Sequence, residues 1–381
     1  MNLQRSPWVD RDVADLKDMA TKFFEAEAVP NRERWEEQRR VDREFWFKAA
    51  ELGLLCASIP EEYGGGGGSF AHDFAIFEAQ YHCGECGFGN VVHSGIVAHY
   101  LLAYGSEQQK HRWLPKMATG ELVGALAMTE PGAGSDVKAL RTTAIRDGDY
   151  LVVNGAKTFI SNGASADLII VVARTDPAAG TKGISLVVVE PTAVNGFRVG
   201  RVLDKLGMKA QDTAELYFDD VRVPVENLVG EEGRGYGYVM KQLAHERLLV
   251  AATGLATLER AVAETISYAK QRQAFGAPLL SLQNTRFELA DCATIARVAR
   301  TFVDECIVKH VRGDLDPVTA SMAKAWVTDM QCTVIDRCLQ LFGGYGYMLE
   351  YPITRMFADS RAQRIYAGAN EVMKELIARS L

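Results

Sequence analysis

The sequence RTTAIRDGDYLVVNGAKTFI, residues 141–160, carries two tight-turn signals inside runs of strand-forming residues. Asp147-Gly148 and Asn154-Gly155 are dipeptides that favour two-residue β-hairpin turns, because Gly, Asn and Asp tolerate the positive φ that such turns need. Apolar and polar residues around them alternate with a period near two, which is typical of strands. The stretch therefore predicts an antiparallel meander with strands at residues 141–146, 149–153 and 156–160.

The same period continues beyond the meander. Further strand-like runs are found at residues 168–174, 184–190, 197–202 and 214–223. No helical pattern is interleaved with these runs, which disfavours a parallel βαβ sheet. We therefore expect a central β domain at residues 121–230, built as a small antiparallel barrel or sandwich.

Helical patterns flank this region on both sides, because apolar residues there recur at three- and four-residue intervals. The helices are expected at residues 13–24, 42–52, 74–81 and 91–104 before the strands, and at residues 248–262, 287–309 and 317–342 after them. Five glycines, Gly64 to Gly68, interrupt the first group and are interpreted as a slack loop. The order of helices, strands and helices indicates an α+β protein, with helical domains at residues 1–120 and 231–381.

The composition excludes several classes of protein. A formal net charge of −7 over 381 residues disfavours a nucleic-acid-binding protein, which needs a concentrated basic surface. No stretch approaches the roughly 20 apolar residues that a membrane span requires. The first ten residues lack the pattern of a secretory signal, and Asp10, Asp12 and Asp15 make the N-terminal region too acidic for a transit peptide. Seven scattered cysteines, including the CxxC of Cys83 and Cys86, indicate reduced thiols in a cytoplasmic protein and no metal site.

The loop AMTEPGAGSD at residues 127–136 is a candidate binding segment. Gly132 and Gly134 would let the backbone approach a ligand closely, and Thr129 and Ser135 offer hydroxyl groups. Free backbone N–H groups in such a loop suit an anionic or heteroaromatic ligand. The spacing is not GxGxxG, and no strand–helix junction surrounds it, so the loop taken alone predicts no more than a turn.

This loop is one of several segments that together resemble the acyl-CoA dehydrogenase family over essentially the whole chain. The others are KTFISN at residues 157–162, KLGMKAQDT at 205–213 with FDDVRVP at 218–224, QRQAFG at 271–276 and QLFGGYG at 340–346. The resemblance implies the fold of that family, with an N-terminal helical domain, a central β domain and a C-terminal four-helix bundle. It also implies FAD as the cofactor and an acyl-CoA as the substrate.

The resemblance further implies which residues bind the flavin. Members of the family pack the isoalloxazine ring between the β domain and the C-terminal helices. The matching positions here are Met128, Thr129, Gly134, Phe159 and Ser161. Hydroxyl groups at two of these positions could donate hydrogen bonds to the flavin ring and tune its readiness to accept hydride.

The nucleotide part of FAD is implied to bind at the two C-terminal segments. Arg272 would contact the pyrophosphate, since a guanidinium binds two oxygens at once. Phe275, Gln340, Gly343 and Gly344 would complete the pocket, which in the family belongs to a neighbouring subunit. A homo-oligomer, usually a tetramer, is therefore expected. Taken alone, Arg272 would be an ordinary surface cation and Phe275 an ordinary core aromatic.

Dehydrogenation of an acyl thioester requires a carboxylate base in a dry pocket, where desolvation raises its pKa. Many members of the family carry this glutamate near the C-terminus, at the position that Ala367 occupies here. Long-chain and isovaleryl-type members carry it instead at the start of the long C-terminal helix, where this chain has Glu246. Glu246 paired with Ala367 therefore favours Glu246 as the base, with Glu371 as the alternative. A glutamate in a first helical turn also has a plain explanation in the helix dipole.

The residues implied to contact the substrate are Ser135, Arg247, Tyr366, Ala367 and Gly368. Ser135 would lie near both the cofactor and the pantetheine arm, and Arg247 would position the active-site region. The remaining residues surround the thioester.

The expected reaction is α,β-dehydrogenation to the trans-2-enoyl-CoA, with hydride transfer to flavin N5 and electrons passed on to an electron-transfer flavoprotein. The segments KAQDTAELYFDD, HERLLVA and MKELIAR are most similar to long-chain members, which suggests a long or branched acyl chain. Two alternatives remain: a flavin oxidase or monooxygenase on the same fold, and a non-catalytic protein that binds acyl-CoA or flavin.

Overall fold

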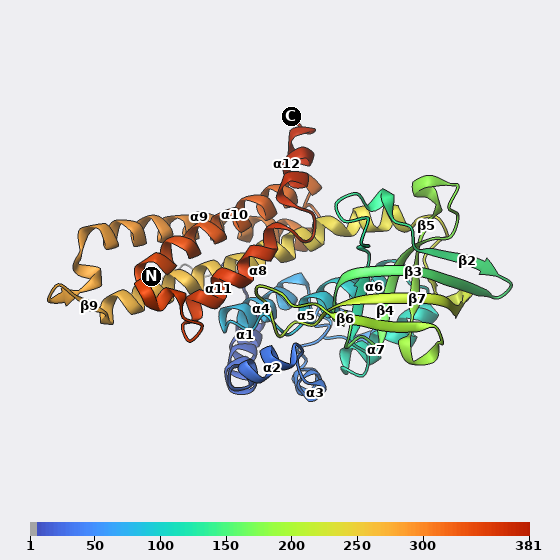
Figure 1. Cartoon of the computed structure of the whole chain (residues 1–381), viewed down its shortest axis with the longest axis horizontal. Coiled ribbons are helices and arrows are strands. Elements are labelled where there is room, and N and C mark those ends of the chain that lie inside the picture. Colours follow the sequence, from blue (N-terminus) through green and yellow to red (C-terminus); the bar gives the residue numbers. More distant parts are fainter. Residues whose placement is uncertain (1–5) are drawn as a thin grey trace.

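The computed structural model describes residues 6–381, and its elements follow the order of helices, strands and helices along the chain. Figure 1 shows the strands gathered at one end of the molecule and the long C-terminal helices extending away from them. The first five residues, on which part of the expectation about targeting signals falls, lie outside the described residues.

The N-terminal region contains helices at the four expected places and two further helices, at Arg32–Gln38 and Glu107–Ala118, that were not expected. They are α1 (Arg11–Phe23), α2 (Arg32–Gln38), α3 (Arg43–Glu51), α4 (Phe70–His82), α5 (Asn90–Val92), α6 (Ala98–Tyr104) and α7 (Glu107–Ala118). The rings of Phe24, Phe45, Phe88 and Trp46 pack together in their core. The same hydrophobic core includes Leu248 and other buried residues of the C-terminal helices, so the two helical regions share one interior.

The five glycines do not form the slack loop that we expected. Each of the residues Gly64 to Gly68 donates a backbone hydrogen bond to a carbonyl between Cys56 and Glu61. A Cβ atom on Gly65 would lie 2.2 Å from the Ile59 carbonyl oxygen, and one on Gly66 would lie 2.8 Å from that of Ala57. Glycine is therefore needed here because two backbone segments pack against each other without space for a side chain.

The central strands form one eight-stranded sheet with the order β6-β7-β3-β2-β4-β5-β8, and β1 pairs with β4. The strands are β1 (Gly124–Ala127), β2 (Thr143–Asp147), β3 (Tyr150–Ser161), β4 (Leu168–Arg174), β5 (Ile184–Val189), β6 (Phe197–Val202), β7 (Thr213–Pro224) and β8 (Leu228–Val229). Most pairings are antiparallel, as expected, but β1 and β2 each pair with β4 in parallel. The short β1 had no clear alternating pattern because nearly all of it is buried.

One of the two predicted hairpin turns is wrong. Asp147 pairs with Tyr150 across a two-residue turn, which confirms the first hairpin. Asn154-Gly155 instead lies inside the continuous strand β3, at a shift in its register with β7. A Cβ atom on Gly155 would lie 2.4 Å from the Thr142 hydroxyl oxygen. The dipeptide therefore marks a β-bulge and a close approach, and no chain reversal occurs there.

The C-terminal region consists of α8 (Gly235–Gln271), α9 (Gln283–Arg312), α10 (Pro317–Phe342), α11 (Pro352–Ser360) and α12 (Asn370–Ala378). Helix α8 packs against α9, α10 and α11, and Figure 1 shows it running from the β region along the bundle. It begins 13 residues before the expected residue 248. No helix among residues 6–381 is long and apolar enough to cross a membrane.

Candidate active site

Glu246 lies in the fourth turn of α8, because the helix begins at Gly235 and each turn takes about 3.6 residues. The expectation of a first-turn glutamate stabilised by the helix dipole is therefore wrong, because the dipole effect fades within one turn. The residue is only 4% exposed. Burial raises the pKa of its carboxyl to about 7, although the Tyr100 hydroxyl and the Arg247 charge both favour the ionised form.

The only hydrogen-bond donor that the described residues offer to the Glu246 side chain is Tyr100. Its hydroxyl group, on α6, donates to Glu246 Oε1 at 2.9 Å. Tyr100 is fully buried and belongs to the hydrophobic cluster that also contains Leu243 and, at its edge, Met128. The carboxylate thus lies in an apolar region where the N-terminal helices, α8 and the start of the AMTEPGAGSD loop meet.

Arg247 follows Glu246 and is also buried. Its Nη1 atom donates to the Ser321 hydroxyl oxygen on α10 at 3.2 Å, while its buried Nε atom has no partner within residues 6–381. Burial lowers the pKa of this guanidinium, opposed by the charge of Glu246. The arginine has no ion pair with a carboxylate in the described part of the chain.

The segment Tyr366–Gly368 forms a turn with an unusual backbone. Ala367 has a φ of 52° and Gly368 a φ of 89°. Within residues 6–381 the N–H groups of these two residues donate no hydrogen bond, so they remain available to a ligand. The turn is connected to α8 because Gln363, just before it, donates to the Thr253 hydroxyl oxygen at 3.1 Å.

Glu371, the alternative base, stands in the first turn of α12 and its side chain is exposed. At this exposed position the carboxylate is open to water, and it offers no dry pocket to a reacting centre. The environment of Glu246 is therefore better suited to proton abstraction.

A buried lysine fixes the start of the AMTEPGAGSD loop by hydrogen bonds. Lys157 Nζ, on β3, donates to the Met128 carbonyl oxygen at 3.0 Å and to Glu130 Oε1 at 2.8 Å. The Thr158 N–H donates to the Thr129 carbonyl oxygen at 2.9 Å. These contacts fix the backbone of Met128 and Thr129 beside β3.

Phe159 lies at a second bulge of β3, where its register with β7 shifts between Lys157 and Ile160. Its φ of 58° turns the side chain outward, and 66% of the residue is exposed. Ser161 follows and is half-buried at the end of the strand. An aromatic ring presented in this way from a rigid strand can form the wall of a binding site.

The outer part of the loop is open. Gly134 and Ser135 are exposed, and Cβ atoms on Gly132 and Gly134 would meet no atom within 4 Å. Packing within this chain therefore does not require glycine at these positions, and the space beside them is free for a ligand.

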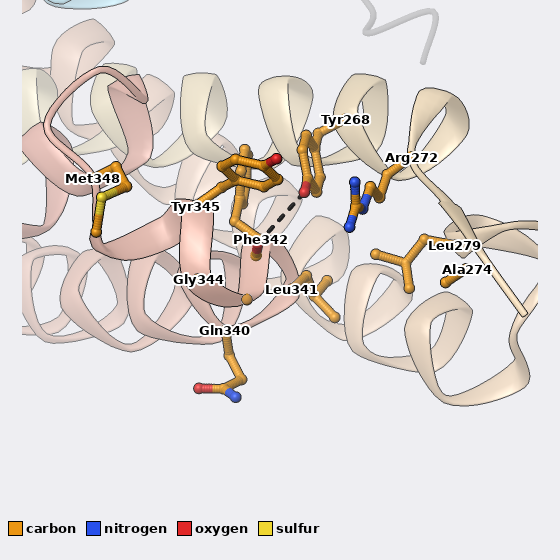
Figure 2. Close-up of a pocket in the computed structure, with 11 residues that line it drawn as sticks. Tyr268, Arg272, Ala274, Leu279, Gln340, Leu341, Phe342, Gly344, Tyr345 and Met348 are labelled. Atoms are coloured by element: carbon orange, nitrogen blue, oxygen red, sulfur yellow. Dashed lines mark hydrogen bonds between the residues drawn. The ribbon is translucent and has the colours of Figure 1, made fainter.

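The C-terminal segments form a cavity of about 540 Å³ between α8 and α10. Its lining includes Arg272, Gln340, Gly343 and Gly344, four of the five residues predicted for the nucleotide pocket. Figure 2 shows the Tyr345 ring, the Tyr268 ring and the Arg272 guanidinium in one row along this cavity. The Arg272 guanidinium carbon lies 5.4 Å from the centre of the Tyr345 ring.

Phe275 is the fifth of these residues, and it does not line the cavity of its own chain. It lies at the turn between β9 (Gln273–Ala274) and β10 (Ala277–Pro278), and 95% of it is exposed. A bare phenylalanine at a hairpin tip suits contact with another molecule.

The sequence motifs did not reveal four residues of these sites. Tyr100 carried no signal, because a tyrosine in an apolar helix resembles a core aromatic. Tyr268 lies three residues before the segment 271–276, and Tyr345 lies inside the segment 340–346, but neither was singled out. Lys324 did carry a signal, as a lysine within the otherwise small and apolar stretch ASMAKAWV of α10. Residues 6–381 contain no cluster of side chains suited to a metal ion.

Three family models match consecutive parts of the chain. The N-terminal, middle and C-terminal domains of acyl-CoA dehydrogenase match residues 10–121, 125–221 and 233–381. The chain belongs to the acyl-CoA dehydrogenase family. It is therefore an oxidoreductase that acts on acyl-CoA, with the α+β fold expected from its sequence.

Individual relatives agree with this assignment. The mitochondrial long-chain specific acyl-CoA dehydrogenase of Rattus norvegicus is 46% identical over 96% of this chain and 85% of its own length. The crystal structure of an acyl-CoA dehydrogenase from Geobacillus kaustophilus superposes with a TM-score of 0.96 at 46% identity, covering 98% of this chain and 99% of its own. An acyl-CoA dehydrogenase of Bacillus anthracis complexed with FAD superposes with a TM-score of 0.91 at 30% identity, over 98% of this chain and 67% of its own.

The residues of this acyl-CoA dehydrogenase fit FAD, the cofactor of its family. The open glycines and the exposed Phe159 of the β domain provide a surface for a flat aromatic ring. The cavity beside Arg272 provides a cation and tyrosine rings, which suit a pyrophosphate and a purine.

Proposed function

We propose that this enzyme dehydrogenates a long-chain or branched acyl-CoA to the trans-2-enoyl-CoA, with Glu246 as the base that removes the α-proton. The observation that carries this proposal is a buried glutamate whose pKa is raised to about 7, in a chain with alanine at residue 367. A base with a pKa near the working pH combines proton affinity with a large ionised fraction.

The side chains around Glu246 support the proton transfer. Tyr100 holds one carboxylate oxygen, which leaves the other oxygen to accept the α-proton. The free N–H groups of Ala367 and Gly368 would receive the thioester oxygen and stabilise the negative charge that grows there. Arg247 adds a buried positive charge beside the base. FAD, when bound, would supply the hydride acceptor at N5.

We propose that Met128, Thr129, Gly134, Ser135, Phe159 and Ser161 form the flavin site of this chain. Arg272, Gln340, Gly343 and Gly344 would bind the nucleotide part, and Phe275 would reach the cofactor of a neighbouring subunit. The large exposure of Phe275 supports this role, as do Tyr347 at 84% and Leu349 at 62% in the same C-terminal region. Apolar side chains of this size are expected to be covered in a homo-oligomer, for which we propose a tetramer.

Three further assignments extend the proposal. Electrons would leave the enzyme to an electron-transfer flavoprotein. The 46% identity to a long-chain specific relative supports a long acyl chain, although each methylene in such a pocket contributes only about 1–3 kcal/mol of discrimination. All seven cysteines are free thiols, which suits a reducing compartment, and we place the enzyme in the cytoplasm.

Anaerobic mixing of the FAD-loaded enzyme with butyryl-, octanoyl-, palmitoyl- and isovaleryl-CoA tests the proposed reaction. We expect the flavin absorbance to bleach, fastest with palmitoyl-CoA, and the product to be the trans-2-enoyl-CoA. Unchanged flavin absorbance with every thioester would contradict the function. Rapid turnover under air without an added acceptor would favour an oxidase instead.

The Tyr100 hydrogen bond gives the base a testable pH dependence. We expect kcat/KM to rise with pH through about 7 as Glu246 loses its proton. The Tyr100 hydroxyl favours the ionised carboxylate, so Tyr100→Phe should raise the pKa of the base. A hydrogen bond to a charged group contributes about 1.5–3 kcal/mol, and one pKa unit corresponds to about 1.4 kcal/mol, so the shift should be about one unit or more.

Tyr104→Phe is the matched control, because Tyr104 lies one turn further along α6 and does not contact Glu246. The profile of kcat/KM from pH 5 to 9 should be the same for this variant as for the wild type. If the rise of kcat/KM occurs at the same pH in Tyr100→Phe as in the wild type, the hydroxyl does not affect the pKa of the base.

A further inference from the structure

A second buried cation, Lys324, lies beside the turn at residues 366–368. It lies on α10 with 0% exposure. Its Nζ atom donates to the Gly368 carbonyl oxygen at 2.7 Å and to Asn370 Oδ1 at 2.8 Å. Both acceptors are uncharged, and both lie within three residues of Ala367.

Lys324 makes no ion pair with any carboxylate in residues 6–381. Burial lowers its pKa to about 8, opposed by the charge of Asp329. The ammonium therefore remains protonated at neutral pH without a direct counter-ion. Such a group costs free energy of folding, and a methionine of similar volume would avoid that cost.

The position of Lys324 relates it to the base. Ser321 and Lys324 stand one turn apart on α10, so they project from the same face of the helix. Ser321 accepts the hydrogen bond from Arg247, and Lys324 donates to the turn. The positive charge of Arg247 also lowers the pKa of Lys324, after the larger effects of burial and of Asp329. One face of α10 thus connects the neighbour of the base to the turn whose N–H groups are free.

We propose that Lys324 is a positioning residue for the dehydrogenation, which holds the Ala367–Gly368 turn so that its free N–H groups receive the thioester oxygen. This inference rests on the proposed function. Together with Arg247, the ammonium also supplies positive charge in a region of low dielectric, where it favours a negatively charged enolate over the neutral thioester.

The orientation of the turn requires such a contact, because two successive residues of positive φ are not held by any helix or strand. Asn370 is fixed by Ala325, Thr328 and Asp329 at distances between 2.9 and 3.2 Å. Lys324 donates to both Asn370 and Gly368, so it links the Gly368 carbonyl group to this fixed side chain. Loss of the ammonium would leave the Gly368 carbonyl group without a hydrogen-bond donor and free to rotate.

Lys324→Met tests the proposal, with a 3-thiaacyl-CoA as the probe. This analogue has sulfur at the β-position and no hydride to transfer, so removal of its α-proton stops at the enolate, which gives a long-wavelength charge-transfer band with oxidised flavin. We expect about a tenfold smaller enolate fraction in Lys324→Met, and a kcat lowered by about tenfold or more with little change in KM. The thermal unfolding midpoint should be unchanged or higher, because an unpaired buried charge has been removed.

Lys374→Met is the matched control, since Lys374 is a largely exposed lysine on α12 that lies 3.9 Å from Asp329 and does not contact the turn. It should leave the enolate band unchanged. If Lys324→Met does not fold, Lys324→Gln is measured by the same criteria. A lower unfolding midpoint with an unchanged enolate band and kcat would show a purely structural lysine and overturn the proposal.

The same probe separates this inference from the proposed function. Failure of the wild-type enzyme to form the enolate band would contradict the function itself. A band that forms in the wild type, disappears in Glu246→Gln and is unchanged in Lys324→Met would uphold the function and overturn only the role of Lys324.

Discussion

Glu246→Gln is expected to abolish flavin reduction by acyl-CoA while the protein keeps its FAD. Glutamine preserves the volume of the side chain and can still accept the Tyr100 hydrogen bond, but it cannot take a proton. A general base contributes about 10²–10⁴-fold to a rate, so anaerobic stopped-flow should show reduction slowed by at least that range. The flavin-to-protein absorbance ratio should equal that of the wild type.

Glu371→Gln is the matched control for this experiment. Glu371 is the exposed glutamate nearest to the turn in sequence, and its substitution should leave the reduction rate within about threefold of the wild type. Reduction near the wild-type rate in Glu246→Gln, or a large loss in Glu371→Gln, would reverse the assignment. The double variant Glu246→Gln with Ala367→Glu should recover measurable reduction, because it moves the carboxylate to the position that other family members use.

Lys157→Met is expected to destabilise the β domain by about 3–5 kcal/mol, the loss typical of removing one partner from a buried ion pair. Lys157 and Glu130 have side chains that are 0% and 6% exposed, and their charged atoms lie 2.8 Å apart. The substitution would leave Glu130 as a buried charge supported only by the N–H groups of Arg141 and Thr142. It would also deprive the carbonyl groups of Met128 and Val172 of their donor.

Urea unfolding monitored by circular dichroism measures this loss of stability. The flavin-to-protein absorbance ratio after gel filtration measures a second effect, the retention of FAD. We expect weaker retention of FAD, because the backbone of Met128 is no longer held beside β3. Lys182→Met replaces an exposed lysine of the same region and should change neither quantity. The additional change Glu130→Gln should restore part of the stability of Lys157→Met, since it removes the uncompensated charge. A stability loss below about 1 kcal/mol in Lys157→Met would contradict the account.

Much of the fold was predictable because local patterns agreed with it. The spacing of apolar residues located α1, α9 and α10 within a few residues. Helix α8 was predicted too short, because its missed first turns contain Gly235 and Gly237 and bury the polar residues His245, Glu246 and Arg247, which give no apolar period. The Asn154-Gly155 signal failed for a different reason: the same glycine that permits a turn also permits the approach of Thr142.

The candidate site divides in the same way. The motifs located Arg272 in one segment and Gln340, Gly343 and Gly344 in another, and these residues line one cavity. They could not indicate Tyr100, because its partner Glu246 is 146 residues away in the chain.

The sequence by itself determined the family, the order of helices and strands, and the exchange of a carboxylate at residue 367 for one at 246. These are properties of residue identity and local spacing. The tertiary structure decided the state of that carboxylate. Its pKa depends on burial and on Tyr100, and the availability of the Ala367 and Gly368 N–H groups depends on a turn held by α10. Desolvation, charge and orientation arise only when distant segments pack together, so no local pattern contains them.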